Sequence, residues 1–166
     1  MLVSNNRSAE ATAFAAEQGV PCRYIPTQSD PGGADAELAR AMSEAGVELI
    51  VLSGYLRHLG PVTLGRYRNR IVNVHPSLLP AFGGEGMYGR RVHEAVISAG
   101  AARSGATVHL VDEAYDRGAV LAQRSIEVHP GESVDSLEAR VTALEPPLFV
   151  ETLQRVASGE LELPAG

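Results

Sequence analysis

The chain has little cysteine, little basic charge and no long apolar run, and each shortage excludes a class of protein. Cys22 is the single cysteine in 166 residues, which excludes an internal disulfide framework and suits a reducing compartment. No apolar run approaches the ~18 residues that a membrane-spanning helix needs. The first residues also lack the charged-then-apolar pattern of a secretion signal. We therefore expect a soluble cytoplasmic protein.

Basic residues are too few and too dispersed for a nucleic-acid surface. Lys and Arg number 14 against 20 Asp and Glu, a formal net charge of −6. The local cluster of Arg66, Arg68 and Arg70 is more typical of a solvated turn than of a phosphate-binding stripe. The five histidines follow no HExxH or clustered Cys/His spacing, so we expect no metal site.

Strand and helix patterns alternate along the chain and predict one α/β domain over residues 1–166. Strands are expected at 1–5, 21–26, 48–53, 70–74, 105–112 and 119–128, and the run ELIVLSGY from Glu48 reads as a fully buried strand. Helices are expected at 10–18, capped by Ser8, and at 34–46, 61–67 and 90–99. A last helix begins at Ser133 or Asp135 and is interrupted at Pro146 and Pro147 before it continues to Ser158. This order predicts a Rossmann-like, mostly parallel sheet with an antiparallel edge.

The run NVHPSLLP carries the strongest chemical signal. Asn73 and His75 lie on alternate positions of an extended segment, so their side chains share a face at the end of a strand. An amide can donate to a developing oxyanion, and an imidazole can carry a proton near neutral pH. Asp116, with Gly118 behind it in the loop EAYDRG, could orient His75. This set indicates acyl-type transfer without naming the substrate.

Structural interpretations of the same residues stay open. An Asn-x-His after a strand is more often structural than catalytic, and Asp116 alone reads as a turn residue. His109 has apolar neighbours and is interpreted as a hydrogen-bonded core histidine. Cys22 is interpreted as a half-buried strand residue, and His93 and His129 as ordinary histidines.

Several longer segments match one family in order and spacing. They are LIVLSGYLRHLGP, RIVNVHPSLLPAFGG, SGATVHLVDEAYDRGAVLAQ and LEARVTALE. From Leu49 to about Ser158 the chain resembles glycinamide ribonucleotide formyltransferases, the 10-formyltetrahydrofolate-dependent enzymes of purine synthesis. The resemblance implies the formyltransferase fold and formyl transfer from 10-formyltetrahydrofolate to the amine of glycinamide ribonucleotide. It also implies small-molecule partners, and a homodimer stays open.

The resemblance assigns site residues one by one. Asn73, His75 and Asp116 match the catalytic Asn, His and Asp of the family. The matches for folate binding are Leu56, Arg57, His58, Leu59, Leu64, Ile71, Asn73, Val111, Asp112, Glu113, Ala114, Tyr115 and Asp116. The matches for the amine substrate are Pro76, Gly84, Thr142, Ala143, Leu144 and Glu145, with Glu145 on the ribose hydroxyls.

Three departures from the family pattern concern the amine substrate and the folate tail. Family members begin with a strand and a glycine-rich GxGSN turn that binds the ribose phosphate, whereas MLVSNN aligns with their second strand. A βα unit of roughly 30 residues is therefore expected to be absent, which would leave backbone edges exposed in the sheet. Pro146 follows Glu145 where a histidine is common, and the loop TQSDPGG lacks an arginine that contacts the folate tail. Hydrolysis of 10-formyltetrahydrofolate, or folate binding without turnover, are the alternatives.

Overall fold

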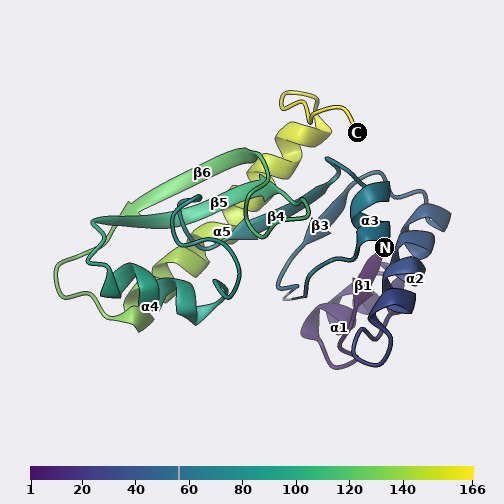
Figure 1. Cartoon of the computed structure of the whole chain (residues 1–166), viewed down its shortest axis with the longest axis horizontal. Coiled ribbons are helices and arrows are strands. Elements are labelled where there is room, and N and C mark those ends of the chain that lie inside the picture. Colours follow the sequence, from purple (N-terminus) through teal and green to yellow (C-terminus); the bar gives the residue numbers. More distant parts are fainter. Residues whose placement is uncertain (56) are drawn as a thin grey trace. The chain divides into compact units, whose positions relative to one another are not determined.

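The computed structural model describes residues 1–55 and 57–166, in which helices and strands alternate along the chain until two consecutive strands precede the last helix (Figure 1). The strands are β1 (Leu2–Ser4), β2 (Cys22–Tyr24), β3 (Ile50–Leu52), β4 (Ile71–His75), β5 (Arg103–Leu110) and β6 (Val120–Glu127). The helices are α1 (Glu10–Glu17), α2 (Pro31–Glu44), α3 (Pro61–Arg66), α4 (Arg90–Ser98) and α5 (Val134–Ala157). The predicted α/β class and order of elements are confirmed.

The described residues form two compact units, and each has its own sheet. The first contains residues 1–48 and 57–67, and the second contains residues 49–55 and 68–166. In the first unit β1 and β2 pair in parallel, and in the second the strand order is β3-β4-β5-β6. β3 and β4 are parallel, and the pairs β4–β5 and β5–β6 are antiparallel. The antiparallel edge was predicted correctly, but the four-stranded sheet is mixed rather than mostly parallel.

Hydrogen bonds at helix starts organise the first unit. The Asp30 side chain accepts from the Gly33 N–H at 2.9 Å, so α2 begins inside the segment that was predicted to be a loop. The predicted cap at Ser8 is wrong, because Ala9 occupies the cap position of α1 and the Ser8 hydroxyl bonds to Asn6 instead. Cys22 lies on β2 as expected but is exposed rather than half-buried.

A buried carboxylate from α2 holds the start of α3. Asp35 is 8% exposed and accepts hydrogen bonds from the backbone N–H groups of Val62 at 2.9 Å and Thr63 at 3.0 Å. These are two of the N–H groups that an α-helix leaves unpaired at its start. Pro61 occupies the first turn, where its missing N–H costs no hydrogen bond. The Asp35 side chain on α2 therefore caps the start of α3.

The core of the second unit lies between its sheet and α5. Val72 on β4 and Val108 on β5 are fully buried, and Leu148 and Phe149 on α5 pack into the same cluster. The prediction that β3 is fully buried is wrong for Val51, which is 43% exposed. Successive side chains of a strand point to opposite faces, and among the residues that the structure describes β3 pairs with β4 on one side only.

The final helix runs through two prolines without interruption, which corrects the sequence prediction. Ser133 caps α5, as expected, by accepting from the Ser136 N–H at 3.2 Å. Pro146 and Pro147 lie inside the helix and have no N–H to donate four residues back. Burial of the side chains that follow the two prolines offsets this loss, because it holds the second half of α5 against the sheet.

Candidate functional site

The carboxyl end of β4 places two polar side chains on one face of the sheet. Asn73 lies opposite His109 on the antiparallel strand β5, and His75 lies opposite Thr107. Asn73 is partly buried, whereas His75 is 3% exposed. The strand geometry predicted for Asn73 and His75 is therefore present.

Asp116 reaches both histidines from the loop between β5 and β6. Its Oδ2 atom lies 3.5 Å from Nδ1 of His75, and its Oδ1 atom lies 3.6 Å from Nε2 of His109. Oδ2 also accepts a hydrogen bond of 2.9 Å from the Gly84 N–H. Asp116 has a φ of +56°, a left-handed backbone conformation that only a minority of residues other than glycine adopt. The structure thus joins Asp116 directly to His75, and it joins Asp116 to Asn73 through His109, which lies opposite Asn73.

His75 already has partners at both ring nitrogens. Nε2 lies 2.9 Å from the carbonyl oxygen of Phe82. A carbonyl can only accept, so this contact requires the proton on Nε2. Nδ1 faces the carboxylate of Asp116. The His75 ring therefore lies between the Asp116 carboxylate and the backbone carbonyl of Phe82.

The segment after β4 is fixed by side chains of β5 and β6. The Thr107 hydroxyl donates to the Ser77 carbonyl at 2.6 Å and accepts from the Leu79 N–H at 3.0 Å. Gln123 donates to the Leu79 carbonyl at 2.8 Å and to Thr107 at 3.0 Å. These bonds set the position of the turn that carries the Phe82 carbonyl and the Gly84 N–H.

A pocket of about 510 Å³ is lined in part by Asp116, whereas Asn73 and His75 are not among its lining residues. Small-molecule sites span about 300–1,000 Å³, so the pocket has the size of one. Its lining residues are Leu79, Pro80, Gly83, Gly84, Tyr115, Asp116, Arg117, Gly118 and Val120. A Cβ on Gly83 would lie 2.4 Å from a Leu79 methyl group and 3.1 Å from the Asp116 Cβ, so a larger residue here would have to displace the Leu79 side chain and crowd Asp116.

His109 is the member of this cluster that sequence reasoning did not assign to the site. As predicted, it is buried, at 2% exposed, and hydrogen-bonded, with Nδ1 2.8 Å from the Leu110 carbonyl. In addition, Nε2 lies 3.3 Å from Nδ2 of Asn73. Burial lowers the pKa of His109. The signal that could have found it is the antiparallel pairing, which places His109 directly across from Asn73.

The residues predicted to bind folate are divided between the two units. In the second unit, the Val111 N–H donates to the Ile71 carbonyl at 2.9 Å, and Asp112 accepts from the Ala114 N–H at 2.9 Å. The side chain of Ile71 is fully buried. Tyr115 and Asp116 line the pocket, and Asp112, Glu113 and Ala114 are exposed. In the first unit, Arg57 and His58 are exposed, and Leu59 and Leu64 are buried, while Leu56 lies outside the described residues.

The residues predicted to hold the amine substrate also lie on separate elements. Gly84 lines the pocket, and Pro76 follows β4 and is partly buried. Thr142 to Glu145 lie on α5, where Thr142 and Ala143 are exposed and Leu144 and Glu145 are partly buried. Burial raises the pKa of Glu145. The lining of the pocket includes Gly84 alone from this set.

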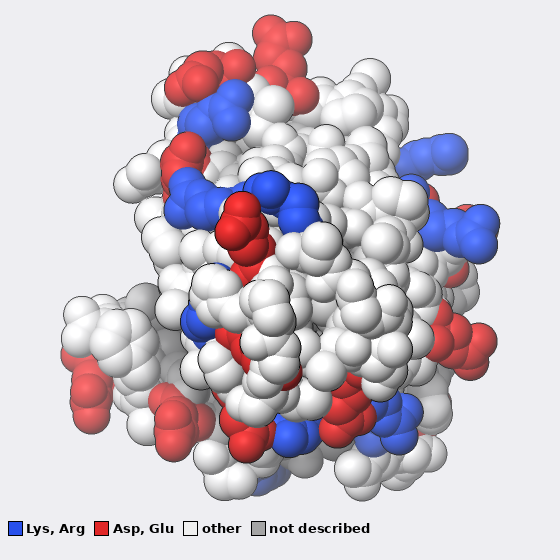
Figure 2. All heavy atoms as spheres, turned by 90° about the vertical axis from the view of Figure 1, so that its left-hand side faces the viewer, with Lys and Arg blue, Asp and Glu red and all other residues white. Residues whose placement is uncertain are grey.

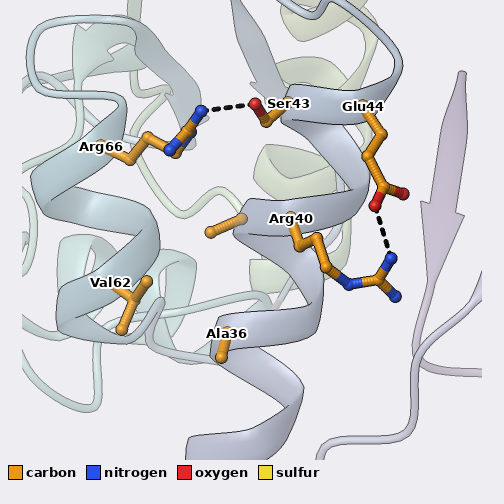
Figure 3. Close-up of a pocket in the computed structure, with 7 residues that line it drawn as sticks. Ala36, Arg40, Ser43, Glu44, Val62 and Arg66 are labelled. Atoms are coloured by element: carbon orange, nitrogen blue, oxygen red, sulfur yellow. Dashed lines mark hydrogen bonds and ion pairs between the residues drawn. The ribbon is translucent and has the colours of Figure 1, made fainter.

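A second hollow, of about 310 Å³, lies between α2 and α3 in the first unit (Figure 3). Its guanidinium groups already have partners, because Arg40 bonds to Glu44 at 2.6 Å and Arg66 bonds to Ser43. Its floor is made of small apolar side chains such as Ala36. We assign no ligand to it.

Charge on the surface is mixed where it can be seen. Acidic and basic side chains stand beside one another on the face shown in Figure 2. The same mixing is seen in ion pairs, since Arg90 pairs with Glu94, Asp135 and Glu138. Within residues 1–55 and 57–166, no three metal-ligating side chains gather, and no helix is long and apolar enough to cross a membrane.

Comparison with known proteins identifies the family. The model of the formyl transferase family matches residues 1–153. The chain belongs to this family. It is 34% identical over 165 residues to the chloroplastic phosphoribosylglycinamide formyltransferase of Arabidopsis thaliana, covering 98% of the chain and 56% of that protein. For the Vigna unguiculata protein of the same name, the identity is 41%, covering 93% and 50%.

The fold agrees with solved structures of the family. The glycinamide ribonucleotide transformylase 1 of Symbiobacterium toebii matches with a TM-score of 0.86 and 31% identity, covering 98% of this chain and 76% of that one. The chain thus has the α/β fold of these formyl transferases, and it spans about half the length of the plant relatives that it matches.

Proposed function

We propose that this chain transfers a formyl group from 10-formyltetrahydrofolate to the amine of glycinamide ribonucleotide, a step of purine biosynthesis. The observation that carries the proposal is that Asp116, which lines a pocket, contacts His75 directly and Asn73 through His109, in a chain of the formyl transferase family. Similar proteins named for this activity support the choice of substrates.

Asn73 has the chemistry to stabilise charge on the formyl oxygen. In the proposed reaction the amine attacks the formyl carbon, which 10-formyltetrahydrofolate supplies, and negative charge develops on the oxygen. A side-chain N–H of Asn73 donates to that oxygen as the charge forms. Such donors act strongly because they are positioned before the reaction begins.

His75 and Asp116 handle the protons. His75, protonated, supplies the proton that the departing folate nitrogen needs, and Asp116 orients the ring and accepts the proton that the amine loses, through water. In the structure Nε2 of His75 bonds to the Phe82 carbonyl. To act on the substrate, Nε2 exchanges this carbonyl for a substrate atom, and the catalytic hydrogen bond then forms only in the complex with substrate.

The experiment is to mix the protein with 10-formyltetrahydrofolate and to measure tetrahydrofolate release with and without glycinamide ribonucleotide. Release that depends on glycinamide ribonucleotide supports the proposal. Release of the same rate without it would instead identify a hydrolase, and folate binding without release would identify a binding protein. A cytoplasmic location and a homodimer stay predictions, and the plant relatives are named as chloroplastic.

A further inference from the structure

We infer that His109 is a positioning residue whose Nε2 atom fixes the orientation of the Asn73 side-chain amide. The inference rests on the proposed function only in naming a formyl oxygen as the group that Asn73 faces. The hydrogen bonding itself follows from β4 and β5, which place the two residues directly opposite each other.

The hydrogen bond of Nδ1 determines the tautomer of His109. Nδ1 lies 2.8 Å from the Leu110 carbonyl oxygen, which can only accept, so Nδ1 carries a proton. In the neutral ring, Nε2 then has a lone pair and accepts. The ring is 2% exposed, and its burial lowers the pKa of His109 and favours this neutral form at neutral pH.

An acceptor at Nε2 selects one of the two orientations of the Asn73 amide. The two ends of an amide side chain differ chemically, since the nitrogen carries two donors and the oxygen only accepts. With Nδ2 of Asn73 3.3 Å from Nε2, one N–H bonds to His109 and the second remains available to a ligand. The flipped Asn73 amide would place its oxygen against the lone pair of His109 Nε2, and this repulsion disfavours the flipped orientation. His109 therefore keeps a donor on the side where the proposed reaction needs one.

Protonation of His109 would reverse this selection. An imidazolium has a donor at Nε2, which would bond to Asp116 Oδ1, now 3.6 Å away, or to the oxygen of a flipped Asn73. The charged groups that act on the ring are Asp116 and Asp112, which favour protonation, and His75, which opposes it. Acid should therefore remove the Asn73 donor by turning its amide.

Nuclear magnetic resonance tests the arrangement without any assay of activity. Two-bond proton–nitrogen correlations of the full chain at pH 7.5 should show His109 protonated at Nδ1 and unprotonated at Nε2. In the parent, one Asn73 side-chain amide proton should resonate downfield of the other because it is hydrogen-bonded. The same should hold in His109→Gln, whose side-chain oxygen can accept, whereas in His109→Phe this downfield displacement should disappear. A proton on Nε2 at pH 7.5, or an Asn73 signal unchanged in His109→Phe, would overturn the inference.

Kinetics then tests whether the orientation matters. His109→Phe should lower kcat about 10- to 100-fold while the KM for 10-formyltetrahydrofolate stays within about twofold, because the lost donor acts in the transition state. His109→Gln should keep most of the kcat. Its kcat should also lack the decrease at acid pH that protonation of His109 causes in the parent. Equal kcat in the parent and His109→Phe overturns the positioning role. If the parent itself shows no turnover, the proposed function fails, and the resonance measurements still decide the arrangement.

Discussion

Asp116 and His75 form a buried pair in which a loop carboxylate faces the ring of a strand histidine, with 3.5 Å between Oδ2 and Nδ1. The side chain of Asp116 is 12% exposed, so little water screens the pair. The same Oδ2 accepts from the Gly84 N–H at 2.9 Å and so links the loop to the turn that borders the pocket. The Asp116 carboxylate therefore orients the His75 ring and also holds the turn that forms part of the pocket wall.

Asp116→Asn keeps the size of the side chain and removes its charge. We expect turnover to fall about 10²- to 10⁴-fold, the range for loss of a positioned acid–base group. The amide oxygen can still accept from Gly84, so the melting temperature should change little. The control is Asp135→Asn, which neutralises a carboxylate that is 78% exposed and pairs with Arg90. Equal turnover in the two variants would remove Asp116 from the proton path.

Asn73→Ala removes the proposed donor to the formyl oxygen. Turnover should fall about 10²-fold or more, as for loss of a single oxyanion donor. Binding of a non-transferable folate, followed by fluorescence, should stay close to that of the parent. Gln18→Ala, which deletes an exposed carboxamide at the end of α1, is the matched control. A loss confined to folate affinity, with kcat unchanged, would contradict the assigned role.

The sequence predicted those parts of the site that depend on local periodicity. Alternation along β4 placed Asn73 and His75 on one face, and the order of strands and helices predicted the sheet edge where they lie. The contact with His109 depends instead on the pairing register of β4 and β5, which a one-residue slip would change for every side chain. The reach of Asp116 depends on a left-handed residue in a loop, which its sequence does not specify.

The fold shows the same division between local and distant causes. The cap at Ser133 and the start at Pro61 are local signals and were predicted correctly. The Asp35 carboxylate that caps α3 lies on another helix, so no short-range pattern could indicate it. Pro146 was predicted to break α5, but packing of α5 on the sheet outweighs that local preference.

The two prolines of α5 should limit the stability of the second unit. Pro146→Ala or Pro147→Ala restores an N–H to the helix ladder, and an interior proline costs about 3 kcal/mol relative to alanine. Because the helix has already adapted to both, we expect each change to add about 1–2 kcal/mol to the free energy of unfolding. Urea denaturation measures it. Pro61→Ala, in the first turn of α3, should give no such gain. A loss of stability in both α5 variants would mean that the rings themselves pack.

Glu145 should lower stability as its carboxyl group ionises. Burial raises its pKa above 4.5, so folding favours the protonated form. Stability from this group is fully present below the unfolded pKa near 4.5 and decreases as pH rises through the higher folded value. The melting temperature of Glu145→Gln should therefore be higher than that of the parent at pH 7, and the two should be equal at pH 4. The exposed Glu10→Gln is the control. If Glu145 holds the ribose hydroxyls, its variant should also raise the KM for glycinamide ribonucleotide.

Ionisation of Glu132 should raise the stability of the protein, whereas ionisation of Glu145 lowers it, so the contribution of Glu132 should be lost in acid. Its side chain is 2% exposed and accepts two hydrogen bonds of 2.8 Å from Arg140, with others from the His129 N–H at 2.9 Å and the Ser136 hydroxyl at 2.8 Å. Arg140, the largest cause, and the other donors lower the pKa of Glu132 from 4.5 to about 2. The resulting stability is present above pH 4.5 and is lost as pH falls towards 2.

Glu132→Gln cannot ionise and should lose this contribution at every pH. Its free energy of unfolding at pH 7 should fall below that of the parent, and the gap should narrow between pH 4.5 and 2. Glu160→Gln, which breaks an exposed pair with Arg155, should follow the parent at all pH values. Urea denaturation at a series of pH values measures the three proteins. A gap that stays constant down to pH 2 would show that the Glu132 charge plays no part in stability.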